Sequence, residues 1–425
     1  MKRKLIAAIG VAVMVAGVAA CGSDDKGSDK AAAPKEITVW LTVDAQKNWP
    51  ELVKQADDAF TAAHKGVKIH HEYYEWTAKN QKLDAVLATK KVPDVVEMGN
   101  TETLGYLVKG AFAPIDKSKF ENSGDWLDAL EGSVTYNGKT YGVPYYAGAR
   151  VGTWRKDVAK AAGVTKAPTT WAELTDALDK IQKKNGDKFS AWYQPSRDWY
   201  TALAFVKDAG GDVAKEDGGK WTASLSDSKS IEGLKTWKGV LDKYFHGDKN
   251  KDESDRYIVY GQGKSALIYG ASWEGGAAAD PKTDKTGKLK DNLETFALPG
   301  PNGDLLPNFI GGSDLVIPAK SGAQDLAADW INDFTDTAAQ KVLISKGNLP
   351  NAKSLLAPLK DDPATAASAR ANENTWFVPT APGWLQVEKK QILQNMLNDI
   401  AVGKASIEDA TKSADDQINA VINAG

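Results

Sequence analysis

The segment ITVWLTVDAQKNWPELVKQADDAFTAAHKGVKIHHEYY, residues 37–74, contains two strand patterns separated by a helix pattern. Residues 37–43 are an apolar run of the kind that forms a buried strand, and residues 67–74 alternate in polarity as a strand does. Between them, residues 49–64 carry apolar side chains at helical spacing. A strand, a helix and a second strand in this order are typical of a parallel sheet covered by helices.

Further patterns continue this alternation along the chain. Strand patterns occupy residues 93–98, 141–146, 264–269 and 315–318, and helix patterns occupy residues 77–89, 323–343 and parts of 387–423. Another helix is predicted to open within residues 168–174, because a capping Thr is followed by an acidic residue in the first turn. We expect an α/β fold of two lobes around a cleft, with crossings near residues 145, 297 and 350; such clefts commonly bind small ligands.

The N-terminal residues have the order of an export signal. Lys2, Arg3 and Lys4 precede an apolar run over residues 5–18, and Cys21 follows two alanines. This order is typical of a secretory signal peptide, here predicted over residues 1–20. Cys21 lies where a bacterial lipobox places the lipidated residue, so we expect a lipid anchor on the outer face of the cytoplasmic membrane, followed by a polar, flexible tether up to residue 36. An ordinary signal peptide with a chance cysteine is the alternative.

The net charge argues against a nucleic-acid partner. The formal charge is −3, and removal of Lys2, Arg3 and Lys4 would take it to −6, whereas a nucleic-acid-binding face is basic. Cys21 is the only cysteine, so no internal disulfide can form and stability must come from the core. The chain also has 14 tryptophans, and core packing accounts for some of them.

Sequence patterns for metal and nucleotide chemistry are missing. His70 and His71 are adjacent, so on a strand they point to opposite faces, and His64 and His246 have no ligand-like spacing. The chain contains neither a Gly-x-x-x-x-Gly-Lys-Ser/Thr phosphate loop nor a Gly-x-Ser-x-Gly hydrolase elbow. We expect no metal, no cofactor and no ATPase activity.

Short sequence blocks follow one another in a specific order. They lie at residues 37–40, 93–100, 110–115, 136–145, 168–171, 263–270, 272–273, 311–314 and 347–350. In order and spacing they resemble the extracellular solute-binding proteins of ABC sugar importers, the group that includes maltose-binding protein. Residues 40–46, Trp-Leu-Thr-Val-Asp-Ala-Gln, add a similarity to actinobacterial lipoproteins that bind N-acetylglucosamine oligomers such as chitobiose.

The resemblance implies a two-lobed periplasmic-binding-protein fold of type II with three hinge crossings. One lobe would comprise residues 37–145 and 298–350, and the other residues 146–297 and 351–425. It also implies a monomer that closes on an oligosaccharide and delivers it to an ABC importer permease. Relatives that bind cellobiose or maltodextrin share most of these blocks, so cellobiose and maltodextrin are alternative ligands.

A sugar site needs flat aromatic surfaces for the C–H faces of the ring and polar groups for its hydroxyl edge. Trp273 follows an apolar strand and a small-residue turn, and the family places a stacking aromatic there. Trp384 lies in a polar segment where the family has an aromatic platform. Trp199 and Tyr200 form a similar aromatic loop, and either could instead cover a helix start.

Polar candidates follow the predicted strands, because α/β sheets bind ligands beyond the carboxyl ends of their strands. Asp44 ends the first strand, with a helix expected to begin near Trp49, so Asp44 binds ligand or caps that helix. The remaining candidates share a position at a strand end or crossing; they are Gln46, Asn100, Thr101, Glu102, Tyr145, Tyr146, Glu274, Gly312 and Ser313. A turn role for Asn100 and a solvated role for Glu274 are the alternatives.

Two other classes of protein compete with the binding protein. A secreted glycoside hydrolase would also have an aromatic cleft, together with a pair of carboxyl groups at defined separation, and the 56 acidic residues do not exclude such a pair. A sensory or adhesive lipoprotein could use the same fold. The lipobox, the tether and the ordered blocks favour the binding protein.

Overall fold

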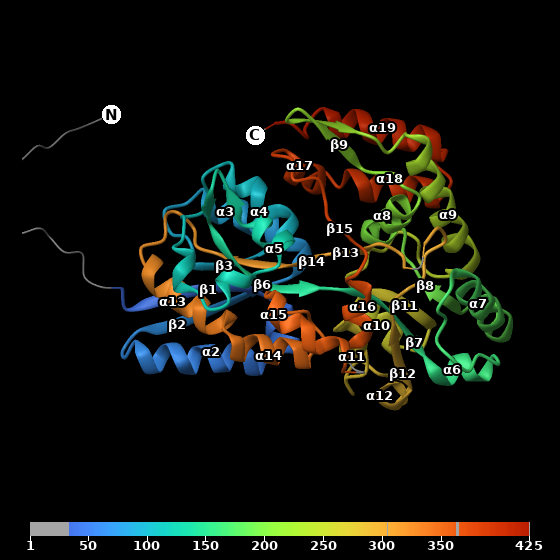
Figure 1. Cartoon of the computed structure of the whole chain (residues 1–425), viewed down its shortest axis with the longest axis horizontal. Helices are drawn as coiled ribbons and strands as arrows, with labels where there is room; N and C mark the ends of the chain where they lie inside the picture. Colours follow the sequence, from blue (N-terminus) through green and yellow to red (C-terminus); the bar gives the residue numbers. More distant parts are fainter. Residues whose placement is uncertain (1–33, 304, 363–364, 425) are drawn as a thin grey trace, which may run out of the picture. The chain divides into compact units, whose positions relative to one another are not determined.

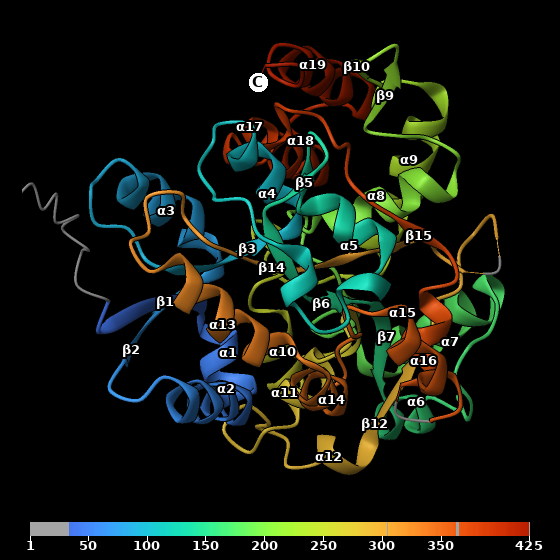
Figure 2. The same cartoon turned by 60° about the vertical axis from the view of Figure 1, so that its left-hand side comes forward.

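Two larger β-sheets, of five and four strands, with helices packed against them organise the part of the chain that the structure describes (Figure 1; Figure 2 gives the same fold turned by 60°). The structure is a computed structural model and describes residues 34–303, 305–362 and 365–424. The predicted signal peptide, the predicted lipidation site Cys21 and the predicted tether up to residue 33 lie outside the described residues.

The first sheet has five strands in the order β2-β1-β3-β14-β6. They are β1 (Glu36–Thr42), β2 (Lys68–Tyr74), β3 (Val95–Gly99), β6 (Gly142–Gly148) and β14 (Gly311–Val316). β1 pairs in parallel with β2 and β3, whereas β14 is antiparallel to β3 and β6. The strands predicted in these regions are confirmed, and the parallel pairing that the 37–74 segment predicts is present.

Alternation along β1 explains why helices cover both faces of this sheet. Ile37, Val39 and Leu41 belong to one cluster with apolar residues of α2 (Pro50–Ala63), α13 (Gln324–Thr335) and α14 (Thr337–Ser345). Trp40 belongs to another cluster, with residues of α3 (Lys79–Leu87) and α4 (Asn100–Leu107). Because successive side chains of a strand point to opposite faces, one apolar strand can serve both clusters.

The second sheet has four strands in the order β12-β7-β11-β8. They are β7 (Arg150–Arg155), β8 (Ser190–Tyr193), β11 (Ser265–Ala271) and β12 (Leu293–Phe296). The helices around it include α7 (Trp171–Asn185), α8 (Trp199–Asp208), α9 (Ser228–Tyr244), α10 (Arg256–Gly261), α11 (Glu274–Ala278), α17 (Trp384–Lys389), α18 (Ile392–Ala401) and α19 (Ile407–Asn419). The Thr170 side chain caps α7 by accepting a hydrogen bond from the Glu173 amide at 3.2 Å, which confirms the predicted helix start.

The two sheets are joined by short passages of chain. β6 ends at Gly148 and β7 begins at Arg150, so a single residue, Ala149, separates the two strands. After β12 the chain runs through β13 (Asn308–Phe309), which pairs with β15 (Thr375–Trp376), and then into β14. These passages bring the ends of strands from both sheets to one place, where the candidate site lies.

The prediction of one long helix over residues 323–343 is wrong in one respect. The segment forms two helices, α13 and α14, which break at Asp336. The Asp336 side chain accepts a hydrogen bond from the Ala339 amide at 2.7 Å and caps the second helix. The apolar pattern continues through the break, so periodicity alone does not reveal it.

The loops predicted after strands also differ from the structure. Asp44 lies in the first turn of a short helix, α1 (Val43–Asn48), which follows β1 directly, and Thr42 is the residue that precedes it. Asn100 begins α4 and Trp199 begins α8, so neither lies in a loop. Each candidate therefore sits on a helix N-terminus that is fixed to a strand or core.

Among the described residues, no helix is long and apolar enough to span a membrane. The same residues contain no group of three or more His, Cys, Asp or Glu side chains placed to hold a metal ion.

Candidate ligand-binding site

A cavity of about 240 Å³ opens where the two sheets meet. The first sheet and its helices contribute Val43, Asp44, Lys47, Glu75, Trp76, Thr77, Gly99, Asn100, Thr101, Tyr146, Gly148, Gly311 and Gly312. The second sheet and its connections contribute Arg150, Tyr200, the residues from Glu253 to Ile258, Ala271, Trp273, Glu274 and Phe309. This volume lies somewhat below the roughly 300–1,000 Å³ that is typical of small-molecule pockets.

Aromatic rings line the cavity from both sides. They belong to Trp76, Tyr146, Tyr200, Tyr257, Trp273 and Phe309. The Trp273 ring meets Trp49 edge-on at 6.3 Å and Tyr257 at 5.6 Å between centroids. These contacts fix the orientation of a ring that is still partly exposed, which is what a stacking platform requires.

Two glycines let the chain approach closely at the floor of the cavity. Gly312 has φ of +144°, and a Cβ there would lie 2.1 Å from the Tyr146 carbonyl oxygen. A Cβ on Gly99 would lie 3.1 Å from the tip of the Trp76 ring. Larger residues would therefore displace Tyr146 or Trp76 from the lining.

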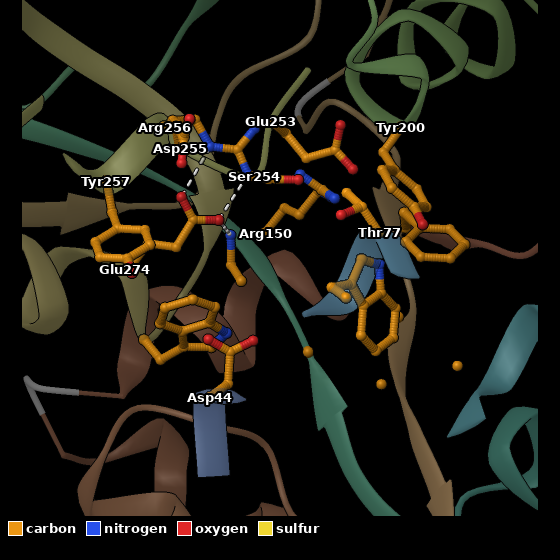
Figure 3. Close-up of a pocket in the computed structure, with 18 of the residues that line it drawn as sticks. Asp44, Thr77, Arg150, Tyr200, Glu253, Ser254, Asp255, Arg256, Tyr257 and Glu274 are labelled. Carbon is orange, nitrogen blue, oxygen red and sulfur yellow. Dashed lines mark hydrogen bonds and ion pairs between the residues drawn. The ribbon is translucent and has the colours of Figure 1, made fainter. Parts of the chain in front are cut away.

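Helices packed on the second sheet supply a buried ionic network in the wall of the cavity (Figure 3). Arg256 is only 1% exposed; its Nε and Nη2 donate to the two carboxylate oxygens of Glu274 at 2.8 and 2.6 Å, and its Nη1 donates to Asp198 at 2.7 Å. Burial opposes ionisation, but both carboxylates hold the pKa of Arg256 above its ordinary value. Glu274 is thereby locked at the start of α11, beside Trp273.

Arg150 belongs to the same network but is bonded differently. Its guanidinium carbon lies 4.4 Å from the centre of the Tyr200 ring, and its Nη1 lies 4.0 Å from Asp198, beyond hydrogen-bond distance. Nη1 is buried and makes no hydrogen bond within the described part of the chain. Arg150 thus places in the cavity wall a guanidinium whose N–H groups are not used in hydrogen bonds within the described residues.

Two carboxyl groups of the lining have raised pKa values. Burial raises the pKa of Asp44 to about 6, with the Glu274 carboxylate adding to the shift and Lys47 opposing it. Burial and the Asp198 carboxylate raise the pKa of Glu253 to about 7. Perturbed carboxyl groups in a cleft are typical of functional sites.

The cavity brings together eight of the residues predicted from the sequence. They are Asp44, Asn100, Thr101, Tyr146, Tyr200, Trp273, Glu274 and Gly312. Asn100 is held by a long hydrogen bond from its Nδ2 to the Ile310 carbonyl oxygen at 3.4 Å. The meeting of these residues from distant parts of the chain follows from the strand ends on which they lie.

The structure places the other six predicted residues beside the cavity and outside its lining. Tyr145 is in the core, where its hydroxyl accepts a hydrogen bond from Trp49 Nε1 at 2.5 Å. Ser313 is fully buried, and Gln46 is exposed on α1. Glu102 pairs with Lys79 at 3.1 Å.

Trp199 and Trp384 lie behind the lining rather than in it. The Trp199 ring stacks on Tyr200 with 4.0 Å between centroids, so it supports a ring that does face the cavity. Trp384 lines a much smaller neighbouring pocket with Asn100 and Thr101, and its indole N–H donates to Glu388 at 2.6 Å.

Several lining residues were not predicted. Trp76 follows β2, so the rule that led to Asp44 and Asn100 could have found it. Arg150 lies directly after the first crossing, next to the predicted Tyr145 and Tyr146. Glu253, Tyr257 and Phe309 carry no sequence signal that distinguishes them from other surface or core residues.

Known proteins match the chain over nearly its whole length. The diacetylchitobiose-binding protein DasA of Streptomyces coelicolor is 32% identical over 432 aligned residues, which cover 99% of this chain and 98% of that protein. Among solved structures, an ABC transporter solute-binding protein of Thermotoga lettingae bound to α-D-tagatose has a TM-score of 0.79, with 21% identity, 91% of this chain and all of that chain covered. The GacH receptor of Streptomyces glaucescens, solved without ligand and with acarbose, has a TM-score of 0.78, with 20% identity and coverage of 92% and 99%.

These similarities settle fold and family. The two solved structures show the fold alone, and they confirm the predicted two-lobed α/β architecture of type II periplasmic binding proteins. A family model of bacterial extracellular solute-binding proteins matches residues 55–371, and the predicted resemblance is confirmed. The chain belongs to the bacterial extracellular solute-binding protein family.

Proposed function

We propose that this protein captures an oligosaccharide of N-acetylglucosamine, with diacetylchitobiose as the model ligand, and delivers it to the permease of an ABC importer. The observation that carries the proposal is the cavity, in which aromatic rings and polar groups from two sheets face one space. Stacked rings suit the C–H faces of a pyranose, and the polar groups suit its hydroxyl edge. The full-length similarity to a diacetylchitobiose-binding protein supports this choice of sugar.

Individual residues take defined roles in this proposal. Trp273 and Tyr200 are the stacking surfaces on the side of the second sheet, and Tyr146 and Trp76 face them from the side of the first sheet. Asp44 and Asn100 bond the hydroxyl edge from the first lobe, and Glu274 does so from the second. Trp199, Trp384, Tyr145, Glu102, Ser313 and Gln46 act by support, or by contact with a longer ligand.

Lobe closure couples binding to delivery. Residues 37–145 with 298–350 form one lobe, and residues 146–297 with 351–425 form the other. Ligand contacts with both lobes exist only in the closed form, so the ligand shifts the hinge equilibrium toward closure. The closed monomer then docks on the permease.

Export and anchoring complete the proposal. Residues 1–20 are removed as a signal peptide, and the lipid on Cys21 holds the chain on the outer face of the membrane. Membership of an extracellular family supports export. In a Cys21→Ser variant, the exported protein should move from the membrane fraction to the medium; retention on the membrane would contradict the anchor.

Glycoside hydrolysis is the second candidate, and one observation favours it. Asp44 and Glu253 both line the cavity and both have raised pKa values, of about 6 and about 7, as a general acid requires. The family consists of binding proteins, so we propose that no sugar is cleaved.

Calorimetric titration with product analysis tests both candidates. The purified protein is titrated with diacetylchitobiose, cellobiose, maltose and free N-acetylglucosamine, and each sugar is then analysed for breakdown. We expect binding of diacetylchitobiose at micromolar affinity or better, about −8 kcal/mol, with the disaccharide intact. Breakdown would favour the hydrolase, and tighter binding of cellobiose or maltose would move the ligand to another sugar class.

A further inference from the structure

Two arginines of the second lobe belong to the same ionic network but differ in their hydrogen bonds. Arg256 uses Nε, Nη1 and Nη2 in hydrogen bonds to Glu274 and Asp198. Arg150 donates no side-chain hydrogen bond within the described residues, and its buried Nη1 has no partner. Arg256 therefore fixes the positions of Glu274 and Asp198, while Arg150 has side-chain donors that are free to bind a ligand.

The position of Arg150 is nevertheless fixed. Its guanidinium lies over the Tyr200 ring at 4.4 Å, and Asp198 lies 4.0 Å from Nη1. A stacked guanidinium keeps its N–H groups in the ring-parallel plane, pointing outward from its edge. Nη1 is inaccessible and faces Asp198, whereas Nε and Nη2 make no hydrogen bond within the described residues and are not buried, so they are the donors that a ligand acceptor would meet.

A free acceptor lies beside this free donor. Figure 3 shows the Glu253 carboxyl group at the Tyr200 end of the cavity, near Arg150 and away from Asp44. Within the described part of the chain, the Glu253 side chain makes no hydrogen bond with another residue, and Arg150 acts on it only through its charge. The same end of the cavity thus offers one donor and one acceptor.

Apolar surface adjoins these two polar groups. Tyr200 and Phe309 both line the cavity, with 4.6 Å between their ring centroids. Phe309 in turn packs on Trp376 at 5.0 Å, which holds it in place. A small apolar group placed between Arg150 and Glu253 would rest on these rings.

We propose that Arg150, Glu253 and the paired rings of Tyr200 and Phe309 form a subsite for the acetamido group of an N-acetylglucosamine unit. Arg150 donates to the acetyl oxygen, Glu253 accepts from the amide N–H, and the methyl group packs on the two rings. This subsite rests on the proposed function and names the residues that select the sugar class.

The subsite distinguishes between sugars because a hydroxyl or ammonium group in place of the acetamido group leaves Arg150 or Glu253 without a hydrogen-bond partner. A hydroxyl at the same ring carbon is smaller than an acetamido group and cannot reach both polar groups, so Arg150 or Glu253 is left without a partner in the closed site. An ammonium at that carbon can donate to Glu253, but it offers Arg150 no acceptor and brings a second positive charge next to the guanidinium. The acetamido sugar should therefore bind more tightly than either analogue.

Three disaccharides with the same β-1,4-linked backbone test this order in the unmodified protein. Diacetylchitobiose, cellobiose and fully deacetylated chitobiose differ at the ring carbon that carries the acetamido, hydroxyl or ammonium group. By calorimetry we expect diacetylchitobiose to bind about 10- to 100-fold more tightly than the other two, the effect of one charge-assisted hydrogen bond. Equal affinities, or preference for an analogue, would overturn the subsite.

Variants then assign the preference to residues. Arg150→Met keeps the apolar stem and removes the donors, so the ratio of diacetylchitobiose to cellobiose affinity should fall about tenfold or more. The affinity ratio of Arg150→Lys should lie between those of Arg150→Met and the wild type, because lysine keeps the positive charge but lacks the planar, multiple N–H donors of the guanidinium. Arg370→Met, the same change at an exposed arginine of α16 (Ala366–Ala371), should leave the ratio unchanged.

The outcomes separate this inference from the proposed function. Failure of the wild type to bind any of the three sugars overturns both. Binding of diacetylchitobiose with an unchanged ratio in Arg150→Met overturns the subsite alone. If Arg150→Met does not fold, Glu253→Leu takes its place, and an unchanged ratio there has the same meaning.

Discussion

Removal of Arg256 tests whether the buried network holds the second lobe together. The Arg256→Met variant keeps the size of the side chain and removes three hydrogen bonds, of 2.6 to 2.8 Å, to Glu274 and Asp198. Both carboxylates are almost fully buried, so the change leaves two negative charges in the interior without their partner. Breaking a buried ion pair by removing one member costs about 3–5 kcal/mol.

A surface pair sets the scale for this prediction. Lys166 and Glu173 lie 2.9 Å apart, and the Lys166 side chain is 75% exposed. Exposed ion pairs contribute about 0.2–1 kcal/mol. Lys166→Met should therefore change the free energy of unfolding several times less than Arg256→Met.

Urea unfolding followed by circular dichroism measures both variants at pH 7.5. We expect the loss of about 3–5 kcal/mol in Arg256→Met to be partly recovered in Arg256→Met combined with Glu274→Gln, because one of the orphaned charges is then absent. A loss no larger than that of Lys166→Met, or no recovery in the double variant, would show that the ion pairs of Arg256 do not stabilise the second lobe.

The other predictions concern the cavity and the core beneath it. Trp273→Ala should weaken binding of diacetylchitobiose about 10- to 100-fold in calorimetry, because a stacking surface is lost; unchanged affinity would remove Trp273 from the site. Gly312→Ala places a Cβ 2.1 Å from a carbonyl oxygen of β6 and should lower the free energy of unfolding by about 1–3 kcal/mol, whereas Gly276→Ala, which meets nothing within 4 Å, should be nearly neutral; equal effects would argue against the close approach. Burial raises the pKa of both Glu97 and Asp314 to about 7, so both carboxyls bind protons more tightly in the folded chain than in the unfolded one. Stability should therefore fall as pH rises from about 4 to about 7; a higher melting temperature at pH 7.5 than at pH 5 would contradict this, and Asp314→Asn should reduce the dependence.

The sequence predicts the strands well because burial on both faces leaves a continuous apolar run. Residues 37–43 are such a run, and β1 is the strand that serves two clusters. The break at Asp336 is invisible to the same argument, since the apolar spacing of α13 continues into α14 and only a cap separates them. Local hydrogen bonds, rather than burial, decide such boundaries.

The sequence predicts those residues of the candidate site that directly follow a strand. Asp44 and Asn100 follow β1 and β3, and the topology of the sheet brings them together. Which of two adjacent aromatic residues faces the cavity depends on packing from elsewhere in the chain. Tyr200 faces the cavity and Trp199 supports it, and the sequence treats them alike.

Arg150 shows a further limit of sequence reasoning. Its role depends on side-chain donors that make no hydrogen bond within the described residues, and on the contact of its guanidinium with the Tyr200 ring. Neither property leaves a mark in the local sequence. Only the three-dimensional network distinguishes this arginine from Arg256.

A crystal structure of the protein with diacetylchitobiose tests the proposed function most directly. We expect the sugar in the cavity between the two sheets, with a ring stacked on Trp273 or Tyr200, an acetyl oxygen within hydrogen-bond distance of Arg150, and the glycosidic bond intact. A sugar bound elsewhere on the chain, or a cleaved product in the cavity, would contradict it.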